Sequence, residues 1–262
     1  MYPVLLSFKI PILDIPFALP TYGFFLATAF VLAIQLGHVW AMRKGYDPEV
    51  MGNFYVVLIL SSIAGARAVF VWLKWPSYFA DHMWESVLIW RGGLVFYGGV
   101  IGGVIGCLIY VFYHRLDPWA IGDLAAPCLA LGHMVGRVGC LLNGCCFGGP
   151  TDLPWGMSFP ATAYDKIPRH PTQLYEILGL AVIFLLLGRL FWRPHRAGAV
   201  AMTYVGLYAC LRFTIEVFRG DDRGGAFAGG FSVSQWIAIG ALLASLVGWT
   251  RILRRPVLNE EE

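Results

Sequence analysis

The sequence predicts an all-α, polytopic integral membrane protein with about seven transmembrane helices and a small periplasmic cap. Of its 262 residues, 58% are hydrophobic and 13% are charged, whereas ordinary soluble proteins are about 25% charged. The mean hydropathy is +0.66, and seven stretches approach the roughly 20 apolar residues that a bilayer crossing requires. These observations exclude an ordinary soluble enzyme. The net charge of +3 is too small to indicate a nucleic-acid partner.

The predicted spans lie where apolar runs reach this length. They are Pro20–Ala41, Asn53–Leu73, Leu94–Tyr113, Trp119–Val135, Thr172–Leu190, Ala197–Phe218 and Phe231–Trp249. The fourth has the weakest signal because it is short and contains Asp123 and Pro127. Three prolines and two charges interrupt Met1–Leu19, which favours an interfacial segment over a cleavable signal peptide. We expect a single transmembrane domain over residues 1–262.

Fixed positive charge is concentrated in alternate gaps between the predicted spans. These basic residues are Arg43, Lys44, Arg115, Arg189, Arg193, Arg196, Arg251, Arg254 and Arg255. Basic loops usually remain in the cytoplasm, so the N-terminus is expected to be periplasmic and the C-terminus cytoplasmic. Residues 136–171 then form an outward-facing cap between the fourth and fifth spans.

Charged side chains inside the spans are the strongest functional signal, because each costs about 2.5–3.5 kcal/mol near the centre of a bilayer. The sixth span and its end carry such residues at a spacing that keeps them on one helical stripe. They are Tyr208, Arg212, Glu216 and Arg219. This stripe has an excess of positive charge, and Arg137 at the outer end of the fourth span can reach the same level. Arg67 lies in the second span.

Guanidinium groups grip phosphate oxygens in a bidentate manner and stay charged at any relevant pH. We therefore interpret the arginines as a site for a phospholipid headgroup. The structural alternative is that Arg212 and Glu216 neutralise each other, while Arg137 and Arg219 extend toward lipid headgroups.

A glycine-rich run, RGGLVFYGGVIGGVIG, occupies residues 91–106. Gly98, Gly102 and Gly106 form one ridge of small residues, and Gly99 and Gly103 form a parallel one. Close helix packing is the favoured interpretation. A groove for acyl chains is the alternative, and both can hold on different helix faces.

Three of the six cysteines, Cys140, Cys145 and Cys146, gather in the segment GRVGCLLNGCCFGG at 136–149. In an oxidising compartment they could form a disulfide or bind metal. No second C-x-x-C or histidine-rich motif accompanies them in the sequence, so we expect no metal and little loss of function on replacement by serine. The glycines and Asn143 fit a tight turn whose N–H groups could face an anion.

Several motifs in sequence order resemble the bacterial prolipoprotein diacylglyceryl transferases, and the resemblance covers nearly the whole chain. They are Tyr22-Gly23, Gly65-x-Arg67, GGLVFYGG at 92–99, GRVGCLLNG at 136–144, RHPTQLYE at 169–176 and R-x3-E-x2-R at 212–219. The resemblance implies a seven-span protein of the bacterial inner membrane. It also implies transfer of the sn-1,2-diacylglyceryl group from phosphatidylglycerol to the lipobox cysteine thiol of a preprolipoprotein signal peptide, with release of glycerol 1-phosphate. No cofactor is implied, and we expect a monomer.

The resemblance also implies roles for individual residues. Arg137 and Arg212 match essential arginines, and Glu216 matches a further functional position; with Tyr97 they form the expected catalytic set. The expected substrate-binding set is Tyr22, Arg67, Gly98, Gly99, Asn143, Gly148, His170 and Arg219. The chain departs from better-known members, which carry His at the position of Tyr97, Asn at Cys140 and Glu at Cys145.

The sequence does not identify the group that accepts the thiol proton. Tyr97 has an unperturbed pKa of about 10, and His170 one of about 6.5. His170 precedes Pro171 at a predicted helix start, however, which favours a capping role. Direct transfer to the substrate phosphate is the third possibility. The alternative function is a membrane transporter or a thiol-redox or metal-binding membrane protein that uses Cys140, Cys145 and Cys146.

Overall fold

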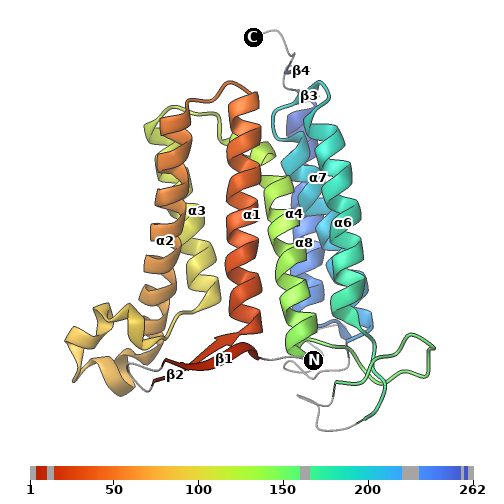
Figure 1. Ribbon diagram of the computed structural model, residues 1–262. Coiled ribbons are helices and arrows are strands. Elements are labelled where there is room, and N and C mark those ends of the chain that lie inside the picture. Colours follow the sequence, from red (N-terminus) through yellow and green to blue (C-terminus); the bar gives the residue numbers. More distant parts are fainter. Residues whose placement is uncertain (1–3, 11–14, 160–165, 220–229, 255–256, 259–262) are drawn as a thin grey trace. The chain divides into compact units, whose positions relative to one another are not determined.

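The computed structural model describes residues 4–10, 15–159, 166–219, 230–254 and 257–258. The chain divides into two compact units, Met1–Gly37 with Gly122–Glu262, and His38–Ile121. Seven helices among the described residues are long and apolar enough to cross a membrane. Figure 1 labels these helices along the chain. The predicted fold class is therefore confirmed.

The seven helices lie where the apolar runs predict them. They are α1 (Thr21–Arg43), α2 (Pro48–Lys74), α3 (Phe96–Tyr113), α4 (Pro118–Asn143), α6 (Thr172–Phe191), α7 (Ala199–Val217) and α8 (Val233–Ile252). Three short helical segments between α2 and α3 are η1 (Trp75–Phe79), η2 (Met83–Val87) and η3 (Ile89–Arg91). Two small antiparallel sheets pair β1 (Val4–Ile10) with β2 (Ile15–Pro20), and β3 (His195–Arg196) with β4 (Val257–Leu258).

Helix α4 corrects the predicted end of the fourth span, because it continues from Val135 to Asn143. The beginning of the segment 136–171, which was expected to be a non-helical cap, is thus helical. The helix ends in a Schellman motif: Gly144 has φ of 77°, its N–H donates to the Leu141 carbonyl, and the Cys145 N–H donates to the Cys140 carbonyl. Arg137, in this added part of the helix, pairs with Glu176.

Asp123, which weakened the sequence signal for the fourth span, is buried and caps the start of α7. Its carboxylate accepts hydrogen bonds from the N–H groups of Gly198 at 2.7 Å and Ala201 at 2.8 Å. His195 Nε2 lies 3.4 Å from the same carboxylate. A negative charge at a helix N-terminus is favourable, so Asp123 joins α4 to α7.

In the smaller unit, α2 and α3 pack side by side through glycines (Figure 1). A Cβ atom at Gly98 would lie 2.5 Å from the Gly65 carbonyl oxygen, and one at Gly102 would lie 2.8 Å from the Gly65 Cα. At Gly99 the nearest such contact is 3.4 Å, to the Ser62 carbonyl oxygen. Close packing of the glycine run is therefore confirmed, and Gly98 in particular lies buried between the two helices.

This packing predicts a position-specific cost for adding one methyl group. Gly102→Ala should destabilise the protein by about 1–3 kcal/mol, because the helix backbones have to separate. Gly52→Ala, also on a helix but with open space at its Cβ position, should be neutral or slightly stabilising. Denaturation of the purified variants in detergent checks this. Equal stability of the two variants would contradict the proposed contact.

Candidate active site

The centre of the polar site is Glu176, in the second turn of α6, which is only 1% exposed. Arg137 Nε lies 2.9 Å from its Oε2 atom, and His133 Nε2 lies 3.3 Å from its Oε1 atom. The Tyr208 hydroxyl donates to the same Oε1 atom at 3.4 Å. One buried carboxylate thus collects polar groups from α4 and α7.

The spacing of His133 and Arg137 explains how α4 supplies two of these groups. They are one helical turn apart, so their side chains lie on the same face. Arg137 Nε also donates to His133 Nε2 at 3.3 Å. The His133 ring meets the Tyr208 ring edge-on, with centroids 5.1 Å apart. Contacts among α4, α6 and α7 therefore fix the guanidinium of Arg137 in place.

A second ion pair lies on α7, where Arg212 Nη2 is 2.7 Å from the Glu216 carboxylate. Both residues also contact the start of α8. Arg212 Nη2 donates to Ser234 Oγ at 3.2 Å, and Ser232 Oγ donates to Glu216 Oε1 at 3.0 Å. Ser232 is the N-cap of α8 and forms a capping box with Gln235. The predicted stripe on this helix is therefore confirmed for its helical members.

The carboxylate of Glu176 makes the net charge of the site less positive than the sequence predicted. The sequence indicated an excess of positive charge, but Arg137 and Arg212 each have a carboxylate partner. Their remaining donors still matter: Arg212 Nη1 is buried without a hydrogen-bond partner among the described residues. Arg137 Nε contacts both Glu176 and His133. The Arg212 guanidinium can therefore donate to an additional anion.

Next to Arg137, the three cysteines Cys140, Cys145 and Cys146 form a cluster in which all Sγ atoms lie within 4.8 Å of one another. The first lies in the last turn of α4, and the other two follow the Schellman motif. Two buried side chains at the start of α6 hold this turn: Thr172 Oγ1 donates to the Cys146 carbonyl, and Gln173 Nε2 to the Cys145 carbonyl, each at 2.7 Å. The sulfur cluster thus has a fixed backbone.

Charge near the cluster is positive. Hydrogen bonds from the thiols of Cys140 and Cys145 lower the pKa of the Cys146 thiol, and the charges of Arg137 and Arg219 lower it further. Arg219 lies two residues after the end of α7, and its N–H donates to the Glu216 carbonyl at 3.2 Å. Both arginines therefore connect the ion-pair site with the sulfur cluster.

Two predicted substrate-binding residues, Tyr22 and Asn143, also belong to this region. Tyr22 interacts electrostatically with the cysteine cluster and with Arg137. It lies at the start of α1, where a Cβ atom on Gly139 would be 3.7 Å from the Tyr22 Cα. The Asn143 side chain interacts with the Cys145 thiol. The structure thus brings Tyr22, Arg137, Asn143 and the cysteines together.

Gly148 and His170 pack against each other beside this region. The Gly148 N–H donates to the His170 carbonyl at 2.8 Å, and a Cβ atom at Gly148 would collide with the Phe218 carbonyl oxygen. The predicted capping role of His170 is wrong, because Pro171 is the N-cap of α6 and no side chain caps it. His170 Nδ1 instead lies 3.2 Å from the Tyr175 hydroxyl.

The other predicted site residues, Arg67, Tyr97, Gly98 and Gly99, belong to the smaller unit. The Arg67 guanidinium donates to the carbonyls of Glu85, Ser86, Gly92 and Gly93. It also lies over the rings of Phe70 and Phe79, 5.4 and 5.5 Å from their centroids. These contacts fix the segment between α2 and α3. Tyr97, at the start of α3, is 73% exposed.

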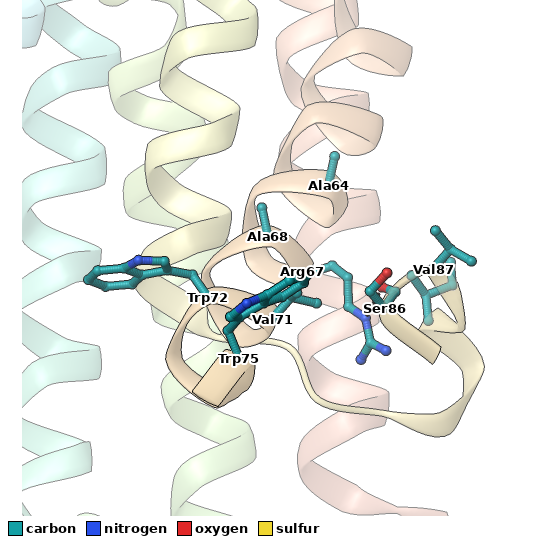
Figure 2. Close-up of a pocket in the computed structure, with 9 residues that line it drawn as sticks. Ala64, Arg67, Ala68, Val71, Trp72, Trp75, Ser86 and Val87 are labelled. Carbon is teal, nitrogen blue, oxygen red and sulfur yellow. Dashed lines mark hydrogen bonds between the residues drawn. The ribbon is translucent and has the colours of Figure 1, made fainter. Parts of the chain in front are cut away.

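Arg67 lines an open, mostly apolar groove of about 610 Å³, whose lining side chains are drawn in Figure 2. Trp72, Trp75, Val87 and Ser86 line it with Arg67, whose guanidinium points toward the η2 segment. Because backbone carbonyls already engage this guanidinium, the groove offers an incoming anion little free charge.

Glu176 and His133 were not predicted as site residues. Glu176 is the last residue of the RHPTQLYE motif, and His133 lies one turn before Arg137. The spacing of polar residues relates positions on one helix, whereas these contacts join three helices.

The sequence matches a known protein family along most of its length. The sequence profile described as "Prolipoprotein diacylglyceryl transferase" matches residues 10–251. The chain belongs to this family. It is similar to the phosphatidylglycerol–prolipoprotein diacylglyceryl transferase of Trichormus variabilis, with 31% identity over 92% of this chain and 89% of the relative. It is also similar to the enzymes of the same name from Thermosynechococcus vestitus (33%, 88% and 87%) and Bordetella parapertussis (34%, 87% and 89%).

The buried pair of Glu176 and Arg137 predicts strong thermodynamic coupling. Glu176→Gln alone should destabilise the protein by about 3 kcal/mol, because it leaves a charge without its partner. Combining it with Arg137→Met should cost less than the sum of the single changes, by at least about 1 kcal/mol. Denaturation of the four proteins in detergent measures the coupling between Glu176 and Arg137.

Arg189→Met is the control, since Arg189 is exposed and lies about 20 Å from Glu176 along α6. The effect of this control on stability should add to that of Glu176→Gln. Additivity for the Arg137 pair as well would contradict the prediction.

Proposed function

We propose that this protein transfers the diacylglyceryl group of phosphatidylglycerol to the lipobox cysteine thiol of a preprolipoprotein and releases glycerol 1-phosphate. The observation that carries the proposal is the pair of guanidinium groups, Arg137 and Arg212, that carboxylates hold in place. Arg212 Nη1 has no hydrogen-bond partner among the described residues. The names of the relatives state the same donor and acceptor classes, which favours this activity over the transporter alternative.

The reaction is a nucleophilic substitution at carbon. The acceptor thiol loses its proton, and its sulfur attacks the glycerol C3 atom. The bond from C3 to the phosphate oxygen breaks, and the electron pair leaves with the phosphate monoester. The protein therefore has to hold the lipid phosphate, stabilise the charge that grows on it, and provide for loss of the thiol proton.

We assign the first two tasks to Arg137 and Arg212. Preorganised donors stabilise a leaving anion without reorganising during the reaction. Glu176 and Glu216 act as positioning residues, since each holds one of these guanidinium groups. Arg219 adds positive charge at the same end of α7.

The remaining predicted residues fall into two groups under this proposal. Tyr22 and Asn143, close to Arg137 and the cysteines, would contact the glycerol or the acceptor peptide. Gly148 is needed for close packing beside this region, and Arg67, Gly98 and Gly99 fix the α2–α3 unit. Of the candidate bases, His170 bonds to the Tyr175 hydroxyl, and Tyr97 stays a candidate polar contact.

We further propose that the protein lies in the bacterial inner membrane as a monomer, with its N-terminus periplasmic and its C-terminus cytoplasmic. The bias of lysine and arginine toward alternate loops supports this orientation. It places the start of α1 and the end of α4 on the periplasmic side, where a secreted preprolipoprotein would present its thiol.

The phosphate-binding role predicts large losses from single changes. Arg137→Ala and Arg212→Ala should each slow transfer from labelled phosphatidylglycerol to a lipobox peptide by about 10²–10³-fold. Lysine at either position should restore only part of the rate, because it keeps the charge but loses the planar fork. Arg189→Ala, at the far end of α6, is the control and should transfer normally. Wild-type rates in both alanine variants at wild-type membrane levels would refute the assignment.

The proposed orientation predicts opposite results for two C-terminal fusions. Green fluorescent protein fused after Glu262 should fluoresce, because it folds in the cytoplasm, whereas alkaline phosphatase at the same site should be inactive. Measuring both fusions in intact cells provides the check. An active phosphatase with a dark fluorescent fusion would reverse the orientation.

A further inference from the structure

The sulfur cluster of Cys140, Cys145 and Cys146 has the composition of a site for a soft metal ion. All six cysteines of the chain are free thiols, and these three have their Sγ atoms within 4.8 Å of one another. Tetrahedral zinc, with Zn–S bonds of about 2.3 Å, requires neighbouring sulfur atoms about 3.8 Å apart. Small side-chain rotations that shorten the distances between sulfur atoms by at most about 1 Å would therefore close the cluster around an ion.

The backbone that carries these thiols is held from outside the cluster. Thr172 and Gln173 are at most 1% exposed, and each donates to the carbonyl of a clustered cysteine. Cys146 has φ of 68°, a conformation that residues other than glycine rarely adopt and that is common at functional sites. The cluster is thus positioned before any ligand binds.

We propose that Cys140, Cys145 and Cys146 bind one Zn²⁺ ion as thiolates and that the fourth coordination position takes the thiol of the acceptor peptide. Three sulfur ligands favour a soft cation, and a site with three protein ligands leaves one position for a substrate. This inference rests on the proposed function, for which it supplies the missing step. It replaces the sequence-based expectation that the cysteines bind no metal and can be exchanged without loss.

The chemical step balances without an oxidant or a base from the protein. A thiol bound to zinc is deprotonated outright, so its proton passes to water as the S–Zn bond forms. The sulfur then uses an electron pair to form the bond to glycerol C3, and the phosphate monoester departs with the electrons of the C3–O bond. The thioether product has no charge on sulfur and leaves the ion.

The charges that face the cluster fit this arrangement. Zn²⁺ with four thiolates carries a net charge of −2, and Arg137 and Arg219 supply two positive charges beside Cys146. The third neighbouring titratable group is Tyr22. Because Arg137 is also assigned to the lipid phosphate, it lies between the two reacting partners and would orient both.

Metal content tests the site directly. The full chain, purified in detergent with reductant and without chelator, should contain about one zinc ion by elemental analysis. Loading with Co²⁺ should give thiolate-to-metal charge-transfer bands, and a lipobox peptide with Cys should change them while the Ser peptide should not. The triple variant C140S/C145S/C146S should bind neither metal. The matched control C107S/C128S/C210S also keeps three cysteines and should bind both as the wild type does.

The pH dependence of transfer tests the proposed role. A free thiol with a pKa of about 8.5 is only about 3% ionised at pH 7, so the cluster variant should be roughly 30-fold slower there. Its rate should rise about tenfold from pH 6.5 to 7.5, following the thiolate fraction of the peptide, while the rate of the wild type stays nearly constant. A purely structural role of the cysteines would lower the rate without creating this slope.

The outcomes separate the two proposals. Active wild-type protein without metal, a cluster variant that still binds Co²⁺, or fewer than six titratable thiols because of a disulfide would each overturn the zinc site and leave the transferase proposal intact. Zinc bound by the cluster in a protein that makes no diacylglyceryl product, however, would refute the transferase and the acceptor role of the fourth position.

Discussion

A charged group in an apolar helix bundle needs a partner, and this requirement determines the arrangement of the site. Glu176 is almost fully buried, where an isolated carboxylate would be very unfavourable. Arg137, His133 and Tyr208 surround it, and these residues come from two further helices. Replacing the polar site residues of any one of the three helices by apolar ones would therefore leave a buried charge or hydrogen-bonding group unsatisfied.

Pairing with carboxylates also determines how strongly the arginines attract an anion. Because each carries its own carboxylate, the site attracts anions less strongly than three free guanidinium groups would. Pairing also removes the freedom of two long side chains in advance, so less entropy is lost when a ligand binds. A nearly neutral but ordered site binds phosphates in general less tightly. It instead stabilises selectively the negative charge that develops during the reaction.

Hydropathy predicted the seven helices because crossing length and apolar composition are properties of one segment at a time. The end of α4 was wrong for the same reason: the apolar run stops at Val135, whereas the helix continues to Asn143 and its Arg137 pairs with Glu176 on another helix. Arg67 was correctly found to be buried, but its carbonyl partners lie in a segment without regular periodicity. Contacts between distant segments leave no pattern in a single sequence, so Glu176 and His133 were missed.

For the cysteines, the expectation from the local sequence differs most from the arrangement of the side chains in space. Two of them, Cys140 and Cys145, are positions at which the chain departs from the pattern of better-known family members, and the three sulfur atoms meet next to Arg137. Alkylation of a thiol needs both a stabilised leaving anion and a thiolate. In the proposed transferase reaction the ion pairs hold the leaving anion, and no described carboxylate or imidazole has been assigned to forming the thiolate. The sulfur cluster beside these ion pairs is therefore the group that we assign to preparing the nucleophile.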